Sequence, residues 1–280
     1  MFFPVKLIRL FGIPLACLYQ ALCIPKIPSL HAALRLAFQD KRTSEEIKKT
    51  SKRFLRNHVC RAIDDIILNR LERKDLLENS RIIGLENLQA ALSAKKGAML
   101  VDGHCFCSRV AKRFLREIGL PVMSVRNRVP DDPCIGRIGA RFLKRRYVDF
   151  LKPLIKDEVF IQDKGFNLKI FKRLRENGLV NIHIDTPSFS YKTIEYPFLG
   201  RKCRFPAGFL RLAKVAGCPV VPMACIGNSA AFTIIFEEPF SMREMKDEES
   251  FLVANLGRLV EILETQILQH PDQWEFWVRL

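Results

Sequence analysis

The pattern of apolar and polar positions changes along the chain. Between Arg42 and Leu77 apolar residues recur every three or four positions, which predicts a long amphipathic helical segment with an acidic start at residues 44–46. Beyond it, short apolar runs alternate with amphipathic stretches, several of them followed by glycine. The runs predict strands at 97–103, 121–125, 179–185, 219–226 and 232–238, and the stretches predict helices at 108–118, 135–146, 167–177, 207–216 and 251–268.

Alternation of this kind predicts an α/β fold in which a mixed sheet is flanked by helices on both faces. Two of the predicted helices are each closed by a glycine, Gly178 and Gly217. Ligands of such sheets bind where strands end. His104, Arg128 and Asp185 each fall just past a predicted strand, so we expect them to share one rim of the sheet.

The amino terminus is apolar, but it is too short to span a bilayer by itself. Its charge-free apolar stretch from Leu10 to Ile24 has 15 residues, whereas a crossing helix needs about 20. Cations and phenylalanines around this run favour a helix lying in the membrane interface, and a core helix packed on the domain is the alternative. No clean cleavage site for a signal peptide follows. We therefore divide the chain into a membrane-associating segment, 1–40, and one domain, 41–280.

The composition is that of a folded and strongly basic protein. Lys and Arg number 46 against 30 Asp and Glu, a formal charge of +16, which favours anionic partners: a phospholipid surface, an acidic carrier protein or nucleic acid. The sequence has no helix-turn-helix, zinc-finger or RNA-recognition signature, and no phosphate loop or dinucleotide fingerprint. Nucleic acid and nucleotides are therefore disfavoured as ligands.

The nine cysteines are scattered through apolar segments, which fits a reducing compartment better than a disulfide framework. Cys105 and Cys107 form the only close pair. Without a second pair at ligand spacing, they are better interpreted as small buried hydrophobic residues than as metal ligands. We expect no metal and no cofactor.

The candidate chemistry begins at His104, between an apolar strand and a basic helix. Imidazole is the side chain best suited near neutral pH to take a proton from a hydroxyl group, although most single histidines are structural. Other segments strengthen the functional interpretation. They are "MLVDGH" at 99–104, "RVPDDP" at 128–133, "LVNIHIDTPSF" at 179–189, "YPFLGRKCRFPAGFLRLAKVAGCPVVPMA" at 196–224 and "HPDQWEFWVRL" at 270–280.

In this order, from about residue 40 to the end, the segments resemble the bacterial late acyltransferases of lipid A synthesis, which belong to the lysophospholipid acyltransferase-like superfamily. The resemblance implies transfer of a fatty acyl group from an acyl carrier protein or coenzyme A thioester to a hydroxyl of a glycolipid. In that family a histidine is followed, after four residues, by a carboxylate that orients the imidazole and stabilises the imidazolium. His104 matches the histidine, but Arg109 occupies the position of the acid.

Two other carboxylates are candidates for the orienting role. Asp102 shares a strand face with His104, with a turn residue before Gly103 as the alternative interpretation. Asp185 occupies the family's acidic strand-end position. It is expected to approach His104 across the rim, to cap the following turn or to orient the acceptor. His183, on the same strand face as Asp185, is interpreted as a packed residue.

Basic residues are the candidate substrate contacts. The resemblance implies that Arg128, before a proline-containing loop, contacts a phosphate of the substrate or carrier, for which a guanidinium fork is well suited. Arg201 and Arg204 lie in a basic loop that enters the helix beginning near Pro206, where a phosphate is expected to bind. Arg109 is a further candidate substrate contact. A solvated basic surface is the alternative for each.

The sequence thus predicts an acyltransferase bound peripherally or monotopically to the cytoplasmic face of the bacterial inner membrane. His104 is its expected general base, Asp102 or Asp185 its partner, and a backbone N–H near Gly103 or a nearby cation its oxyanion stabiliser. The first alternative is a degenerate relative that binds lipid or carrier protein without transfer, because Arg109 replaces the acid. The second is a basic nucleic-acid-binding protein.

Overall fold

The computed structural model describes Pro14 and residues 27–68, 72–105, 107–127, 157–185, 193–228 and 231–277. Its helices are α2 (Ile27–Ala37), α3 (Ser44–Leu68), α4 (Arg73–Glu78), α5 (Leu85–Ser93), α6 (Ser108–Glu117), α9 (Phe166–Arg175), α10 (Gly208–Ala216) and α11 (Glu248–Gln269). Its strands are β1 (Ser80–Ile83), β2 (Ala98–Asp102), β3 (Val122–Arg126), β4 (Glu158–Phe160), β5 (Leu179–His183), β6 (Thr193–Phe198), β7 (Arg201–Pro206), β8 (Val220–Asn228) and β9 (Ala231–Phe236).

Seven strands form one mixed sheet in the order β1-β9-β8-β2-β5-β3-β4. All neighbours in it are parallel except β8 and β9, which form an antiparallel pair. The register of the two central strands places Asp102 beside His183. The chain segments that follow β2 and β5 therefore leave the sheet side by side, at the carboxyl edge where ligands of such folds bind.

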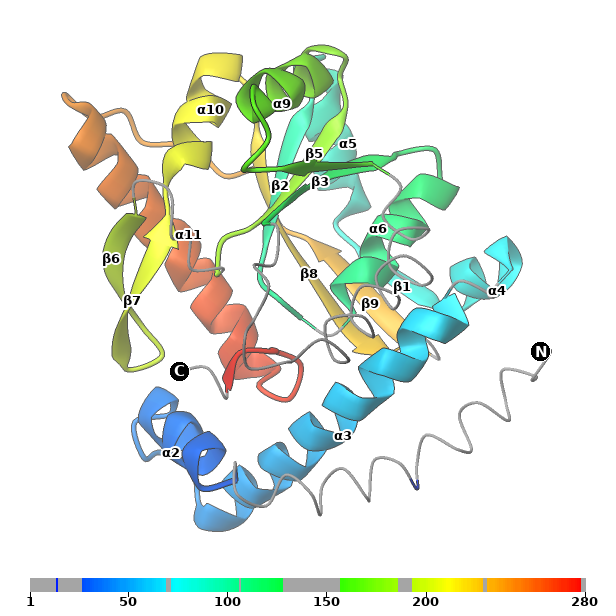
Figure 1. Cartoon of the computed structure of the whole chain (residues 1–280), viewed down its shortest axis with the longest axis vertical. Coiled ribbons are helices and arrows are strands. Elements are labelled where there is room, and N and C mark those ends of the chain that lie inside the picture. Colours follow the sequence, from blue (N-terminus) through cyan, green and yellow to red (C-terminus); the bar gives the residue numbers. More distant parts are fainter. Residues whose placement is uncertain are drawn as a thin grey trace.

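Helices cover both faces of the sheet, as the alternating pattern predicts (Figure 1). Met99 and Val101 of β2 belong to a core shared with α2, α3, α9, α10 and α11, and Ala98 and Leu100 belong to a second core shared with α4, α5 and α6. Successive side chains of a strand point to opposite faces. Strand β2 is buried along its whole length, which explains why its sequence is apolar without alternation from Ala98 to Val101.

Some predicted elements need correction. The predicted helix at 42–77 is two helices, because α3 ends at Leu68 and α4 begins at Arg73. The residue that closes α9 in the left-handed conformation is Asn177, with a φ of 57°, and not Gly178. The predicted helix at 135–146 lies outside the described residues.

The basic loop expected before Pro206 is instead the β6–β7 hairpin, which pairs Thr193 with Pro206 and packs beside α11 (Figure 1). Its two-residue turn places Leu199 and Gly200 at φ values of 52° and 77°, a conformation that leucine rarely adopts. The amide of Leu199 donates to Glu264 Oε1 at 2.7 Å. A tertiary contact thus holds a turn that local sequence does not favour.

The membrane-associating segment proposed for 1–40 falls into two parts. Its charge-free run lies outside the described residues apart from Pro14. Its last part contains α2, where Leu30, Ala33, Leu34 and Ala37 are buried in the larger core. Within the described part of the chain, none of the helices combines the length and apolarity that crossing a membrane requires.

Truncating a buried side chain of α2 tests whether this helix is part of the domain. Leu34 is 0% exposed, so Leu34→Ala is expected to lower the free energy of unfolding by about 2–5 kcal/mol. Leu36, on the same helix but 40% exposed, is the matched control, and its replacement by Ala is expected to cost less than about 1 kcal/mol. Urea denaturation followed by circular dichroism measures both. Equal small costs would contradict the packing of α2.

Candidate active site

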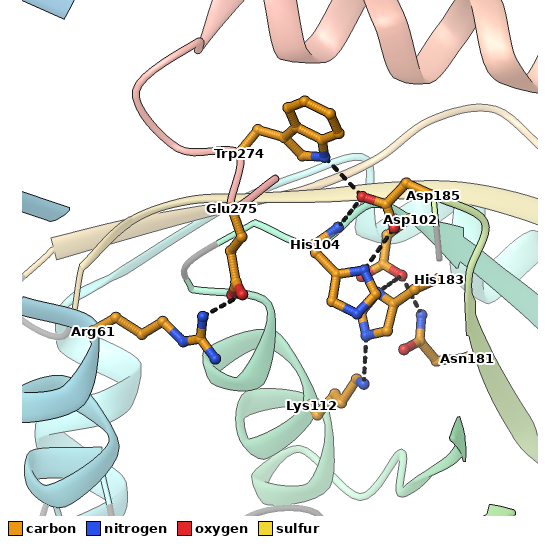
Figure 2. A network of polar contacts seen from close by, with 9 residues as sticks. All are labelled: Arg61, Asp102, His104, Lys112, Asn181, His183, Asp185, Trp274 and Glu275. Atoms are coloured by element: carbon orange, nitrogen blue, oxygen red, sulfur yellow. Dashed lines mark hydrogen bonds and ion pairs between the residues drawn. The ribbon is translucent and has the colours of Figure 1, made fainter. Parts of the chain in front are cut away.

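His104 and Asp185 meet just beyond the ends of β2 and β5. His104 Nδ1 lies 2.6 Å from Asp185 Oδ1, and the side chains are 25% and 1% exposed. The backbone N–H of His104 donates to the second carboxylate oxygen, Oδ2, at 2.7 Å (Figure 2). Asp185 therefore holds the histidine by both its ring and its backbone, which fixes the orientation of the imidazole.

Little room is left for a side chain at Gly103, between β2 and His104. A Cβ there would lie 2.6 Å from Leu263 Cδ1 and 3.1 Å from Asp185 Oδ2. A larger residue would therefore have to displace the leucine side chain and shift the carboxylate that holds His104. The Gly-His dipeptide of the motif is explained by this close approach.

Trp274 completes the surroundings of the Asp185 carboxylate. Its indole Nε1–H donates to Oδ2 at 2.7 Å, and the ring is buried (Figure 2). Burial by itself would raise the pKa of Asp185, but the charge of His104 and the hydrogen bonds from its ring and backbone outweigh burial and lower it. Asp185 is therefore an ionised hydrogen-bond acceptor at neutral pH.

The segment after α11 attaches to the site through several further contacts. The N–H of Glu275 donates to the carbonyl of His104 at 2.8 Å, and Cys105 and Trp274 form an antiparallel bridge. The Glu275 carboxylate pairs with Arg61 of α3 (Figure 2). The segment of chain around residues 271–277 is thus part of the site, although it lies about 170 residues from His104 in the sequence.

The imidazole of His104 lies against two other rings. It is stacked on the ring of Phe276, with a centroid distance of 4.5 Å and an interplanar angle of 29°. The ring of His183 is tilted against it, with a centroid distance of 4.2 Å and an angle of 37°. The face of a phenylalanine ring and a carboxylate such as Asp185 both attract a cation, whereas position 109 carries a guanidinium.

Asp102 serves a different histidine. Its Oδ1 accepts a hydrogen bond from Asn181 Nδ2 at 2.8 Å and lies 2.8 Å from His183 Nδ1, close but poorly aligned for a hydrogen bond. On the other side of the His183 ring, Lys112 Nζ lies 3.3 Å from Nε2 (Figure 2). Asp102, His183 and Lys112 form a second polar chain beside the first. The Asp102 carboxylate thus faces His183, whereas the carboxylate in contact with the His104 ring is that of Asp185.

Burial controls the protonation of this second chain. It lowers the pKa of His183 to about 4, against the attraction of Asp102 and together with the charges of His104 and Lys112. Burial also lowers the pKa of Lys112 to about 8, opposed by Asp102 and assisted by Arg126 and Arg109. At pH 7 the histidine is neutral and the lysine is charged.

A cavity of about 490 Å³ opens beside these residues, a size within the range of small-molecule sites. Its charged and polar walls include His104, His183, Arg109, Lys112 and Arg126. Its apolar walls, mainly from β3, β5, α9 and α10, comprise Val125, Ile161, Phe166, Ile170, Ile182, Pro206, Phe209, Leu212 and Phe276. The histidine pair therefore shares one cavity with both cationic and apolar side chains.

The predicted basic contacts are distributed unevenly. Arg109 lines the cavity, whereas Arg201 and Arg204 of β7 are not among its walls, although Pro206 at the end of the same strand is. Arg128 lies outside the described residues. Sequence reasoning missed Lys112, which reads as one more cation of a basic helix. It also underestimated His183 and Trp274, because a histidine within a strand and a tryptophan after a long helix both have the pattern of core residues.

The close cysteine pair, Cys105 and Cys107, directly precedes α6. Cys107 is buried, and its thiol donates to the carbonyl of Cys225 at 2.7 Å. Burial raises the pKa of the Cys105 thiol well above its usual value. In the described ranges, no three His, Cys, Asp or Glu side chains gather as metal ligands would.

A histidine bonded to a buried carboxylate, at the edge of an α/β sheet and facing a cavity, is the arrangement by which proteins activate a hydroxyl group as a nucleophile. The comparison with protein families agrees with this class. The chain belongs to the bacterial lipid A biosynthesis acyltransferase family, whose model matches residues 1–280. Among curated proteins, no match is found. Acyl transfer is thus the activity that the family implies.

The low pKa of His183 predicts an acid-dependent loss of stability. Between pH 6.5 and about 4, the unfolded chain binds a proton at His183 that the folded chain does not. Stability therefore falls as the pH falls through this window, by up to about 1.4 kcal/mol per pH unit. His183→Asn removes this contribution, so urea titrations across the window should show a shallower decline in the variant. Identical slopes would contradict a buried, neutral His183.

Proposed function

We propose that the protein transfers a fatty acyl group from an acyl thioester to a hydroxyl of a glycolipid, with His104 as general base and Asp185 as its orienting partner. The observation that carries the proposal is the contact of 2.6 Å between His104 Nδ1 and Asp185 Oδ1 at the cavity wall. It supplies the carboxylate that position 109 lacks. Substitution of the motif acid by Arg109 is therefore compatible with a working base.

The contact with Asp185 selects the tautomer of His104. An ionised carboxylate only accepts hydrogen bonds, so the proton of the neutral imidazole resides on Nδ1 and the lone pair on Nε2. Nε2 is consequently the nitrogen that takes a proton from the acceptor hydroxyl. The imidazolium that results is stabilised by the Asp185 charge and by the stacked ring of Phe276.

The proposed reaction has two steps. As Nε2 takes the hydroxyl proton, the acceptor oxygen forms a bond to the thioester carbon, and the C=O π electrons move to the carbonyl oxygen. The oxyanion then collapses, the C–S bond breaks, and the thiolate takes the proton back from Nε2. An ester and a free thiol leave the site, and His104 returns to its starting state.

The walls of the cavity suit these substrates. Side chains such as Ile170, Ile182 and Phe209 offer an apolar surface to an acyl chain, whereas Arg109 and Arg126 face the same space as cations. Phosphate groups of an acyl carrier protein's phosphopantetheine, of coenzyme A or of a glycolipid are anions of the kind that such cations bind. The donor is thus proposed to be an acyl carrier protein or coenzyme A thioester.

Association with the cytoplasmic face of the inner membrane belongs to the same proposal. The formal charge of +16 favours contact with anionic head groups, and the apolar residues at the amino terminus add a hydrophobic contact. A lipid acceptor and a soluble carrier would then meet at one surface.

Transfer itself is tested with purified protein, an acyl carrier protein or coenzyme A thioester, and a bacterial lipid extract as acceptor. Acylated lipid should form, and His104→Ala should abolish it because no other group in the proposed mechanism takes the hydroxyl proton. Thioester and lipid binding without product would favour a relative that has lost transfer. Equal product from wild type and variant would eliminate His104 as the base.

The choice of partner is tested by two isosteric substitutions. Asp185→Asn removes the charge that fixes the tautomer and is expected to lower kcat by about 10²–10⁴-fold. Asp102→Asn is the matched control, because it alters a buried carboxylate that faces His183. The decrease in kcat in this variant should be at least about tenfold smaller than in Asp185→Asn. Both are measured at neutral pH on protein whose fold is checked by circular dichroism. Equal losses, or a larger loss in Asp102→Asn, would overturn the assignment.

A further inference from the structure

Lys112 is a cation of the cavity wall whose ammonium has few hydrogen-bond partners in the described structure. It is 8% exposed and lines the cavity on the α6 face that also carries Arg109. An ammonium has three N–H donors, and the hydrogen-bond partner of Lys112 within the described structure is His183 Nε2, at 3.3 Å. No carboxylate lies within ion-pair distance of it there, whereas Arg126 pairs with Glu158 at 2.9 Å. A buried ammonium with unfilled donors, facing a cavity, indicates a ligand oxygen.

Two backbone donors beside the base are used within the protein. The N–H of His104 donates to Asp185 Oδ2, and the N–H of Cys105 donates to the carbonyl of Gly103 at 2.8 Å. A cation in a buried site is another strong donor for the negative charge that develops on the thioester oxygen.

The second polar chain places Lys112 close to the reacting groups. Its ammonium contacts His183, and the His183 ring lies against that of His104, with a centroid distance of 4.2 Å (Figure 2). Because His183 is neutral, its Nε2 accepts a hydrogen bond from the ammonium and its Nδ1–H faces Asp102. The chain holds Lys112 in place through an uncharged partner and leaves the positive charge undiminished by a direct carboxylate contact.

We propose that Lys112 is a further catalytic residue, whose ammonium binds the thioester carbonyl oxygen and stabilises its negative charge during acyl transfer. This inference rests on the proposed function. Lys112 keeps its three protons throughout both steps, so the proton balance at His104 is unchanged. The ammonium contributes positive charge only, and the interaction strengthens as the carbonyl oxygen becomes an oxyanion.

The charges around Lys112 define the pH range of this role. Arg109 on its own helix and Arg126 on β3 repel it, Asp102 on β2 attracts it, and His183 on β5 is neutral. Of the other elements packed on α6, β8 carries no charged residue and the charged residues of α4 are exposed. Burial and this balance set the pKa at about 8, so transfer should decline as the pH rises above this value.

Lys112→Met tests the assignment, because methionine keeps much of the side-chain volume and removes the charge. It is expected to lower kcat at pH 7 by about 10²–10³-fold, with the KM for the thioester changed less than threefold and no loss of thermal stability. Arg113→Met is the control: Arg113 is the next residue of α6, is equally buried at 8% exposed and does not line the cavity. Its kcat should stay within about threefold of wild type.

Lys112→Arg supplies a second readout. A guanidinium stays protonated at high pH, so a variant that retains transfer should lose the decline above pH 8. Wild-type activity in Lys112→Met would overturn the proposal. So would a loss confined to KM, which would assign Lys112 to ground-state binding of an anion such as a substrate phosphate.

A binding measurement separates this inference from the proposed function. Dodecylphosphonate, used below its micelle concentration, presents a tetrahedral anion on an alkyl chain. Calorimetric titration should give at least a tenfold weaker Kd with Lys112→Met than with wild type or Arg113→Met, whether or not transfer is detected. Equal Kd values for all three proteins would contradict an anion site at Lys112, even if transfer proceeds through His104.

Discussion

The site depends on one buried carboxylate. Removing the ionised side chain of Asp185 from water is costly unless its oxygens are bonded, and three groups bond them: the ring of His104, the backbone of His104 and the indole of Trp274. These groups come from the end of β2 and from the segment after α11. The carboxylate therefore joins parts of the chain that are distant in sequence, and its own burial requires them all to be present.

This constraint explains the local sequence around the site. Gly103 leaves room for the carboxylate against the backbone, and parallel pairing of β2 with β5 places the two strand ends together. The Trp-Glu-Phe sequence at 274–276 then has one task for each residue: the indole bonds Asp185, the Glu275 backbone bonds His104, and the Phe276 ring stacks on the imidazole. What looks like a terminal core motif is a wall of the site.

Much of the architecture was predictable because it follows from periodicity. Buried runs such as that of β2 and glycine-closed helices such as α10, with Gly217 at a φ of 65°, show their structure in local sequence. The β6–β7 hairpin was not predictable, since its turn depends on Glu264 of α11. The pairing of carboxylates was predictable only as alternatives: strand alternation suggested Asp102 for His104, but Asp102 turns to His183, and only the three-dimensional arrangement selects Asp185. Lys112 gave no sequence signal, because its contact with His183 and its place in the cavity wall are set by the three-dimensional arrangement.

The ring nitrogens of His104 offer the most direct test of this account. Nitrogen-15 NMR of histidine-labelled protein reports which nitrogen of the neutral ring carries the proton. With Asp185 ionised and bonded to Nδ1, the spectrum should show a protonated Nδ1 and an unprotonated Nε2 for His104, and Asp185→Asn should abolish this preference. A neutral His104 protonated on Nε2, or a tautomer that is indifferent to Asp185→Asn, would contradict the central claim that this carboxylate prepares the base.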